Sequence, residues 1–369
     1  MRYFPSGIAK GEAFCNRVQE RKKLRQYINS LSHTVLMAPR RYGKLSLITQ
    51  TLMDGKDIYV WVDFLSVASE QDVMAKIHEA SRSLLMQLSP EFKKLQMQAI
   101  DKFKTMSPEL NLHALGQSLT LHLASDNTTP IDQVLKGLDE YAEKIQKKAV
   151  IVFDEFQQIS QLNESHKVEA LIRHAVERST HITYLFSGSN RHMLGEMFSQ
   201  QNRPLYRLCS LIQLSRIAES DYMKFIRTAA QTHWHAAIEV DSVEAILKVT
   251  ERHPYYVNAL CNELWFEDVP PSPNQVEQTW ESYVFNHKSV VISDVIALSL
   301  NQKKILRALS FAAEPEPTGQ AFAEKTHMNP ASIRQALQML ILKDLVYENS
   351  ESKYVVLDPA ISYYFRHIH

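Results

Sequence analysis

Apolar positions recur along the first two thirds of the chain in the pattern of an α/β domain. Apolar or β-branched runs predict buried strands at Thr34–Met37 and Ala149–Phe153, and five apolar residues in a row at 149–153 are typical of a strand covered on both faces. His181–Phe186 is expected to form another strand. Strands are also expected at 57–67 and 208–214, with a strand or hairpin inserted at 111–123. Helical spacing predicts helices at 21–31, after Lys44, and at 69–88, 90–105, 130–147 and 164–179. The pattern therefore predicts a parallel sheet with flanking helices.

The last third of the chain is predicted to be mostly helical. Helices are expected at 220–233, 241–252, 254–266 and 274–286, with a proline-rich break before the last. Three short helices at 301–312, 319–326 and 329–343 precede two strands within 345–357, which is the pattern of a winged helix-turn-helix. We therefore expect a P-loop α/β domain at 1–217, a helical lid and linker helix at 218–292, and a winged helix domain at 293–369.

Composition narrows the class of protein without naming a function. A chain of 369 residues, 45% apolar and 22% charged, suits two or three globular domains. Lys plus Arg and Asp plus Glu both number 41, so no overall charge favours nucleic acid or an acidic membrane. Three distant cysteines form neither a disulfide framework nor a metal spacing. No run approaches a membrane span, so we expect a cytoplasmic protein that does not bind membranes.

A basic loop follows the first predicted strand and has the layout of a phosphate-binding P-loop. The loop is formed by Pro39, Arg40, Arg41, Tyr42, Gly43 and Lys44. In such a loop, backbone amides at a helix N-terminus bind an anion and the lysine neutralises it. Leu45 stands where a Ser or Thr hydroxyl normally ligates Mg²⁺, and Ser46 is rotated about 100° away on the helix. A basic surface turn is the alternative interpretation.

Acidic and polar residues follow two other predicted strands. Asp154 ends the 149–153 run, where it can hold Mg²⁺ directly or through water, and Glu155 can polarise the attacking water as general base. Ser189 and Asn190 follow the 181–186 run, which we expect to lie between the other two motif strands, so they are candidate sensors of the terminal phosphate. The alternatives are an acid pair that caps a helix and a Ser or Asx turn.

Three segments together resemble the archaeal-type ATPases, which are P-loop proteins of the AAA+/STAND group with a C-terminal winged helix. They are Ala-Pro-Arg-Arg-Tyr-Gly-Lys at 38–44, Phe-Asp-Glu-Phe-Gln at 153–157 and Phe-Ser-Gly-Ser-Asn at 186–190. The similarity runs from about Phe4 to the end of the chain. It implies binding of ATP or ADP with Mg²⁺. It also implies a box around Phe14 and Arg17 whose backbone lies against adenine, and a lid motif at His253 and Pro254.

The chain departs from this family at the segment that carries its arginine finger. Many relatives have Pro-x-Tyr-Gly-Arg, whereas here Arg207 follows Tyr206 directly and occupies the position of the glycine. The assignment of an arginine finger therefore stays open. Because Leu45 offers no oxygen to a metal, the sequence favours a nucleotide-dependent ATPase switch with weak hydrolysis. A nucleotide-binding scaffold without turnover remains an alternative.

The predicted winged helix suggests a third hypothesis, a DNA-binding regulator. Its third helix would enter the major groove with Asn329, Ser332, Arg334, Gln335 and Gln338, and its wing would add Lys353. Residues 296–369 hold eight Lys or Arg and seven Asp or Glu. Because phosphate neutralisation supplies much of the affinity for DNA, a protein partner or self-association is at least as well supported.

Overall fold

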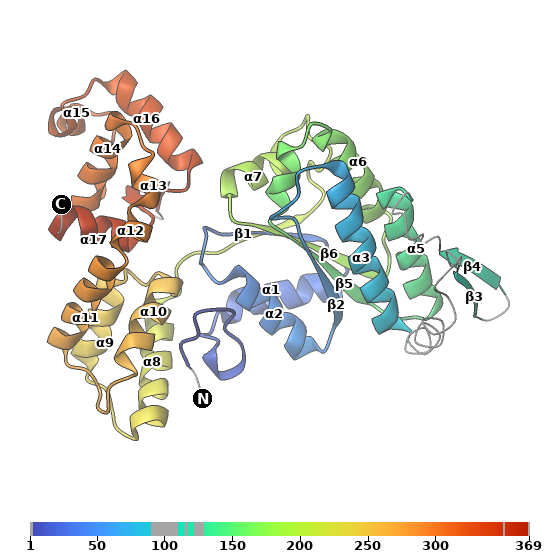
Figure 1. The fold of residues 1–369 in the computed structure, drawn as a ribbon, viewed down its shortest axis with the longest axis horizontal. Coiled ribbons are helices and arrows are strands. Elements are labelled where there is room, and N and C mark those ends of the chain that lie inside the picture. The colour runs from blue at the N-terminus through green and yellow to red at the C-terminus, as the bar shows by residue number, and fades with distance from the viewer. Residues whose placement is uncertain (1–2, 90–109, 115–116, 122–128, 350, 368–369) are drawn as a thin grey trace. The chain divides into compact units, whose positions relative to one another are not determined.

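The computed structural model describes residues 3–89, 110–114, 117–121, 129–349 and 351–367, which form two compact units. The sheet unit consists of Val18–Arg40 and Leu47–Leu214. The helical unit consists of Met1–Arg17, Arg41–Ser46 and Ser215–His369. Figure 1 shows the elements of both units. The helix expected at 90–105 lies outside the described residues.

The sheet unit contains five parallel strands in the order β2-β5-β6-β1-β7. The strands are β1 Thr34–Met37, β2 Ile58–Asp63, β5 Ala149–Asp154, β6 Ile182–Gly188 and β7 Ser210–Gln213. β6 lies between β5 and β1, as the sequence predicted. The carboxyl ends of parallel strands meet at one edge of the sheet, which is where ligands bind in folds of this kind.

Helices cover both faces of this sheet (Figure 1). Alternate strand residues point to opposite faces. Ile151 and Phe153 pack in an apolar core with α3, α5, α6 and α7. The equally buried Val150 and Val152 lie outside that core and point to the opposite face. This double cover explains the continuous apolar runs. The helices are α1 Val18–Asn29, α2 Lys44–Gly55, α3 Glu70–Leu88, α5 Ile131–Lys144, the 3-10 helix η2 Phe156–Gln161, α6 Ser165–Val176 and α7 Arg191–Ser199.

An antiparallel hairpin is inserted between α3 and α5. Its strands are β3 Leu110–Ala114 and β4 Gln117–Leu121, which confirms the strand or hairpin expected at 111–123. α3 begins with a capping box, in which Ser69 and Asp72 satisfy each other's backbone N–H groups.

The helical unit begins with a short N-terminal segment that includes the 3-10 helix η1 Gly11–Ala13, and continues after β7 as a set of lid helices. These are α8 Glu219–Trp234, α9 Val240–Val249, α10 Pro254–Leu264 and α11 Pro273–Asn286, followed by the short α12 Lys288–Val291 and α13 Ser293–Ile296. α9 ends three residues before the expected end, because Glu251 and Arg252 both adopt a left-handed backbone, with φ of 46° and 58°. α11 begins at Pro273 behind a capping box of Ser272 and Gln275.

The C-terminal part of the helical unit is a winged helix. It comprises α14 Leu300–Phe311, α15 Gln320–Thr326, α16 Pro330–Leu342, β8 Val346–Glu348, β9 Tyr354–Val356 and α17 Pro359–His367. Glu314 and Tyr354 exchange backbone hydrogen bonds of 3.1 and 2.8 Å, which adds a bridge to the β8–β9 pair. A single apolar core joins Trp280 of α11 to Ile305 of α14 and Phe365 of α17. The lid helices and the winged helix therefore share one core.

In the described parts of the chain, we find no helix with the length and apolar character that crossing a membrane requires.

Candidate functional site

Asp154 lies at the carboxyl end of β5 and is held by the neighbouring strand. Its side chain is 8% exposed, and the Ser187 hydroxyl of β6 donates a hydrogen bond to its Oδ1 atom. Its backbone carbonyl accepts a hydrogen bond of 3.0 Å from the N–H of Phe64. The carboxylate is therefore fixed at the strand edge, with an orientation set by β6.

Glu155 follows in a left-handed backbone conformation, with φ of 48°. This conformation is uncommon for a residue with a side chain and is found preferentially at functional sites. The Oε2 atom of Glu155 accepts hydrogen bonds from the Ser189 hydroxyl at 2.7 Å, the Ser189 amide at 3.3 Å and Gln157 Nε2 at 2.6 Å. Donors from η2 and from the residue that follows β6 together orient this carboxylate.

Gly188 is required by the packing of Gln157. A Cβ atom at position 188 would lie 2.0 Å from Gln157 Oε1 and 3.3 Å from a methyl group of Leu194. Gln157 is only 3% exposed, so it has little room to move. The glycine therefore allows Gln157 to reach Glu155.

Ser189 and Asn190, the two candidate sensors, have different positions. Ser189 donates to Glu155, as described above. The Asn190 side chain accepts a hydrogen bond of 3.0 Å from Met193 N–H and caps α7. The structure thus gives Ser189 a contact with the candidate base and gives Asn190 a capping role.

In the helical unit, two residues of the proposed P-loop have a left-handed backbone. Arg41 and Gly43 have φ of 64° and 81°, and such left-handed residues among right-handed ones point successive N–H groups inward. α2 begins at Lys44, which is 7% exposed. Leu45 is half-buried, and the Ser46 hydroxyl accepts a hydrogen bond of 2.9 Å from the N–H of Ala9. Pro39 and Arg40, which precede this segment, belong to the sheet unit.

Tyr42 is buried within this loop and is 2% exposed. Its carbonyl accepts a hydrogen bond of 2.9 Å from Arg17 Nη2, which also donates to the Ser215 carbonyl at 3.0 Å. Arg216 Nε donates to its hydroxyl at 3.3 Å. Its ring meets the His253 ring edge-on, with centroids 4.9 Å apart. Arg17 therefore holds the loop by its backbone, while Phe14 lies half-buried just before it.

His253 is a buried and neutral histidine at the start of α10. Its ring is 3% exposed. Burial first, and then the positive charges of Arg216 and Arg41, lower its pKa to about 3. Its Nδ1 atom has no hydrogen-bond partner among the described residues. Pro254 fills the first turn of α10, and Arg41 lies over the ring of Tyr255 at 4.3 Å.

The segment that carries an arginine finger in the relatives is packed against α6. Arg203 donates to Glu169, whose side chain is completely buried. Arg207 is exposed, lies 5.0 Å from the Tyr206 ring centre and has φ of 55°. Arg207 thus adopts the conformation that the glycine of the relatives favours.

The candidate DNA-contacting residues lie on the winged helix as expected from their spacing. Asn329 caps α16 by accepting a hydrogen bond of 2.8 Å from Ser332 N–H. Arg334, Gln335 and Gln338 are exposed on α16. Lys353 on the wing forms an ion pair of 2.9 Å with Glu351. The charge of Lys353 is therefore balanced by a neighbouring carboxylate.

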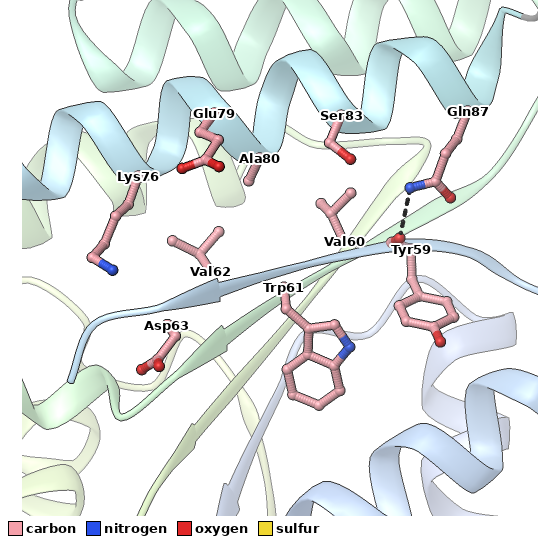
Figure 2. Close-up of a pocket in the computed structure, with 10 residues that line it drawn as sticks. All are labelled: Tyr59, Val60, Trp61, Val62, Asp63, Lys76, Glu79, Ala80, Ser83 and Gln87. Carbon is pink, nitrogen blue, oxygen red and sulfur yellow. Dashed lines mark hydrogen bonds between the residues drawn. The ribbon is translucent and has the colours of Figure 1, made fainter. Parts of the chain in front are cut away.

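A groove of about 370 Å³ lies along the outer edge of the sheet, between β2 and α3 (Figure 2). Gln87 of α3 donates a hydrogen bond of 3.1 Å to the Tyr59 carbonyl on this edge. Asp63, at the end of the groove, stands opposite Asp154 in the strand register. The groove is open and mixed in charge, with Lys76, Glu79 and Asp63 along it.

The residue types alone gave no signal for three partners that the structure reveals. Ser187 and Gln157, which orient Asp154 and Glu155, lie inside two of the segments that carry the family resemblance, but neither residue type by itself indicates this role. Arg216 lies outside all of the motifs. Its contacts come from residues that are distant in sequence, and only the folded chain shows them.

Comparison with known proteins supports the fold. A family model described as a probable winged helix domain matches residues 293–367. The structure resembles a Walker-type ATPase of Pyrococcus abyssi, with a TM-score of 0.73 and 16% identity over 99% of both chains. It also resembles the ORC2 protein of Aeropyrum pernix solved as ADPNP-ADP complexes, with a TM-score of 0.55 and 13% identity over 95% of this chain and 94% of that one. No curated protein sequence matches the chain. At these identities the likeness establishes the P-loop ATPase fold with a C-terminal winged helix, as the sequence predicted.

Proposed function

We propose that the protein binds an adenine nucleotide and acts as a nucleotide-dependent switch that hydrolyses ATP slowly. The observation that carries this proposal is the arrangement of Glu155, which Ser189 and Gln157 hold at the carboxyl edge of a P-loop ATPase sheet. Adenine is favoured because the ORC2 protein, which shares this fold, has been solved with ADPNP and ADP. In this proposal Lys44 and the loop amides bind the phosphates, and Glu155 polarises water.

The side chains present fit Mg²⁺ only in part. Asp154 offers a carboxylate, Leu45 offers no oxygen, and the Ser46 hydroxyl already accepts a hydrogen bond from Ala9. Mg²⁺ commonly binds through one or two carboxylates together with water and substrate phosphates. The donor set therefore fits an ion held by Asp154 and the nucleotide, without a hydroxyl from the loop. Such an ion would neutralise charge on the terminal phosphate. We propose slow turnover because Mg²⁺ would be bound more weakly without a hydroxyl ligand from the loop.

Calorimetry with ATP and ADP tests the binding step. We expect heat of binding with the wild type and a loss of at least tenfold in affinity with Lys44→Ala. Lys136→Ala is the matched control, because Lys136 is an exposed lysine on α5 that forms a surface ion pair with Glu140. Absence of heat with the wild type at millimolar nucleotide would contradict the proposal.

Steady-state phosphate release tests the hydrolytic step. Glu155→Gln should abolish the release, and Leu45→Thr should raise it by restoring a hydroxyl ligand at the loop. Release that persists in Glu155→Gln rules out the assigned base. Tight binding without release in either the wild type or Leu45→Thr assigns the protein to the scaffold class.

A DNA-binding regulator is the second candidate, and the winged helix at 293–367 is the observation that favours it. The ion pair of Lys353 with Glu351 and the nearly balanced charge of this region weigh against it. The double variant Arg334→Glu and Lys353→Glu should abolish DNA binding that weakens as salt rises. Binding that survives both changes excludes the winged helix as a DNA reader.

A further inference from the structure

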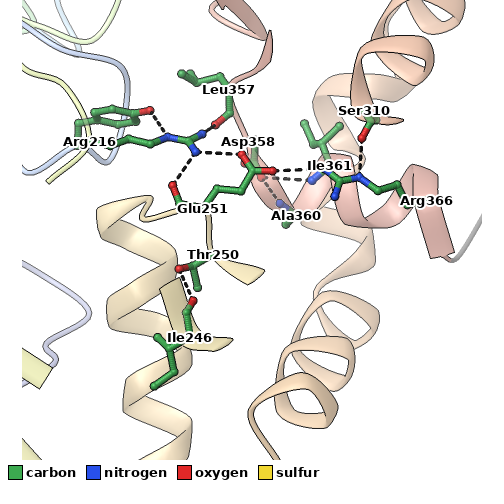
Figure 3. Close-up of polar contacts among 11 residues, drawn as sticks. Arg216, Ile246, Thr250, Glu251, Ser310, Leu357, Asp358, Ala360, Ile361 and Arg366 are labelled. Atoms are coloured by element: carbon green, nitrogen blue, oxygen red, sulfur yellow. Dashed lines mark hydrogen bonds and ion pairs between the residues drawn. The ribbon is translucent and has the colours of Figure 1, made fainter. Parts of the chain in front are cut away.

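Arg216 is a single side chain that connects three separate segments of the helical unit (Figure 3). Its Nε atom donates to the Tyr42 hydroxyl at 3.3 Å. Its Nη1 atom donates to the carbonyl of Glu251 at 2.6 Å and to the Glu251 carboxylate at 2.9 Å. Its Nη2 atom donates to the carbonyl of Leu357 at 3.0 Å. The proposed phosphate loop, the end of the second lid helix and the entry to α17 therefore meet at one guanidinium.

The winged-helix side of this junction is fixed by further contacts. Arg366 of α17 bonds Glu251 at 3.3 Å and donates to the Ser310 carbonyl. The Tyr256 hydroxyl donates to Asp358 Oδ2 at 2.8 Å, and Asp358 Oδ1 accepts from the first amides of α17. The start of α17 is consequently attached to both the lid helices and Arg216.

The Arg216 contacts should form and break together. The guanidinium is charged at every accessible pH and its side chain is only 13% exposed. Removing one acceptor leaves a buried donor without a partner, which costs more than the bond contributes when formed. The planar fork also fixes the directions of the remaining bonds. A shift of Tyr42 therefore weakens the hydrogen bond from Arg216 to Leu357, and a shift of Leu357 weakens the hydrogen bond from Arg216 to Tyr42.

We infer that Arg216 is a positioning residue that connects the Tyr42 loop, Arg41–Ser46, to the winged helix. The conformation of this loop and the packing of α17 on the lid helices are then thermodynamically linked. Arg41 and Gly43 of this loop have positive φ, as residues of anion-binding backbone nests often do. On the basis of the proposed nucleotide binding, the Arg216 contacts stabilise the loop conformation that binds phosphate. Linkage then requires that nucleotide strengthen the attachment of α17 by the same factor.

Hydrogen exchange of the full chain without nucleotide tests the tie on its own. Tyr42→Phe keeps the ring and removes only the hydroxyl, so it should speed amide exchange between Leu357 and Phe365 by about fivefold. Arg216→Gln should have a larger effect, and Arg216→Lys should restore only part of the protection because it lacks the fork. Arg227→Gln, at an exposed arginine of α8, is the control and should leave the exchange of α17 unchanged. Wild-type exchange of α17 in Tyr42→Phe would overturn the inference.

A second measurement separates this inference from the proposed function. Calorimetry of the same variants should show nucleotide affinity reduced about fivefold in Tyr42→Phe and unchanged in Arg227→Gln. Equal affinity in Tyr42→Phe and wild type would overturn the link to nucleotide. Failure of the wild type to bind any nucleotide refutes the proposed function instead, and the exchange measurement still decides whether Arg216 ties the loop to α17.

Discussion

His253 should make the helical unit sensitive to acid. Its pKa is about 3 in the folded protein, against about 6.5 for an unperturbed histidine. Between these values the unfolded chain binds a proton that the folded chain does not. The contribution of neutral His253 to the free energy of unfolding is therefore fully present above pH 6.5 and is lost as the pH falls toward 3. From pH 7.5 to 5.5 the loss from this one residue is about 1.4 kcal/mol.

Replacing the imidazole with a ring that cannot titrate tests this reasoning. His253→Phe keeps an aromatic ring next to Tyr42 and Tyr256. It should therefore remove the pH-dependent loss of stability of about 1.4 kcal/mol. Urea unfolding followed by tryptophan fluorescence is a suitable assay, because Trp234, Trp265 and Trp280 all belong to the helical unit.

The control for this experiment is a histidine with a solvent-exposed side chain. The His192 side chain is 46% exposed and lies 3.2 Å from Glu196, so His192→Gln should retain the wild-type pH dependence. If wild type and His253→Phe lose equal stability between pH 7.5 and 5.5, the assignment of a neutral, buried His253 is wrong.

Two further predictions concern the sheet unit. Gly188→Ala should lower the free energy of unfolding by about 1–3 kcal/mol, because its methyl group displaces the buried Gln157; an unchanged thermal melt would show that Gln157 moves freely. Arg203→Met should cost about 3–5 kcal/mol, because it leaves the fully buried Glu169 without its partner. Arg207→Met, at an exposed position, is its matched control in the same denaturant titration, and similar melting of the two variants would argue against a structural role for the buried pair.

The central strands were predictable because their burial is visible in local sequence. β5 is apolar at every position before Asp154, and the first five residues of β6 are apolar except for Thr183, as suits strands covered on both faces. α7 and α17 were not predicted. The α17 segment Pro359–His367 is a short, mainly apolar run, and such a run is ambiguous between strand and helix. The early end of α9 was also hidden, because Glu251 and Arg252 adopt positive φ without a glycine to signal it.

The candidate site was only partly predictable for a similar reason. Residue types and order place Asp154 at a strand end, since that depends on neighbours in sequence. The partners of these residues do not follow from order. Ser189 reaches Glu155, 34 residues away in sequence, between the ends of two neighbouring strands, and Arg216 meets Leu357 at a separation of 141 residues. The roles assigned to Lys44, Asp154 and Glu155 remain predictions that the binding and turnover measurements decide.

The common core of the lid helices and the winged helix has a mechanical consequence. A domain joined by a flexible linker could bind a ligand without moving its neighbour, whereas Trp280, Ile305 and Phe365 are packed together in one core. A ligand that binds α16 would therefore move the winged helix and the lid helices as one rigid body. Because the segment Arg41–Ser46 belongs to the same unit, a displacement of α16 would be transmitted to the proposed phosphate loop within that unit.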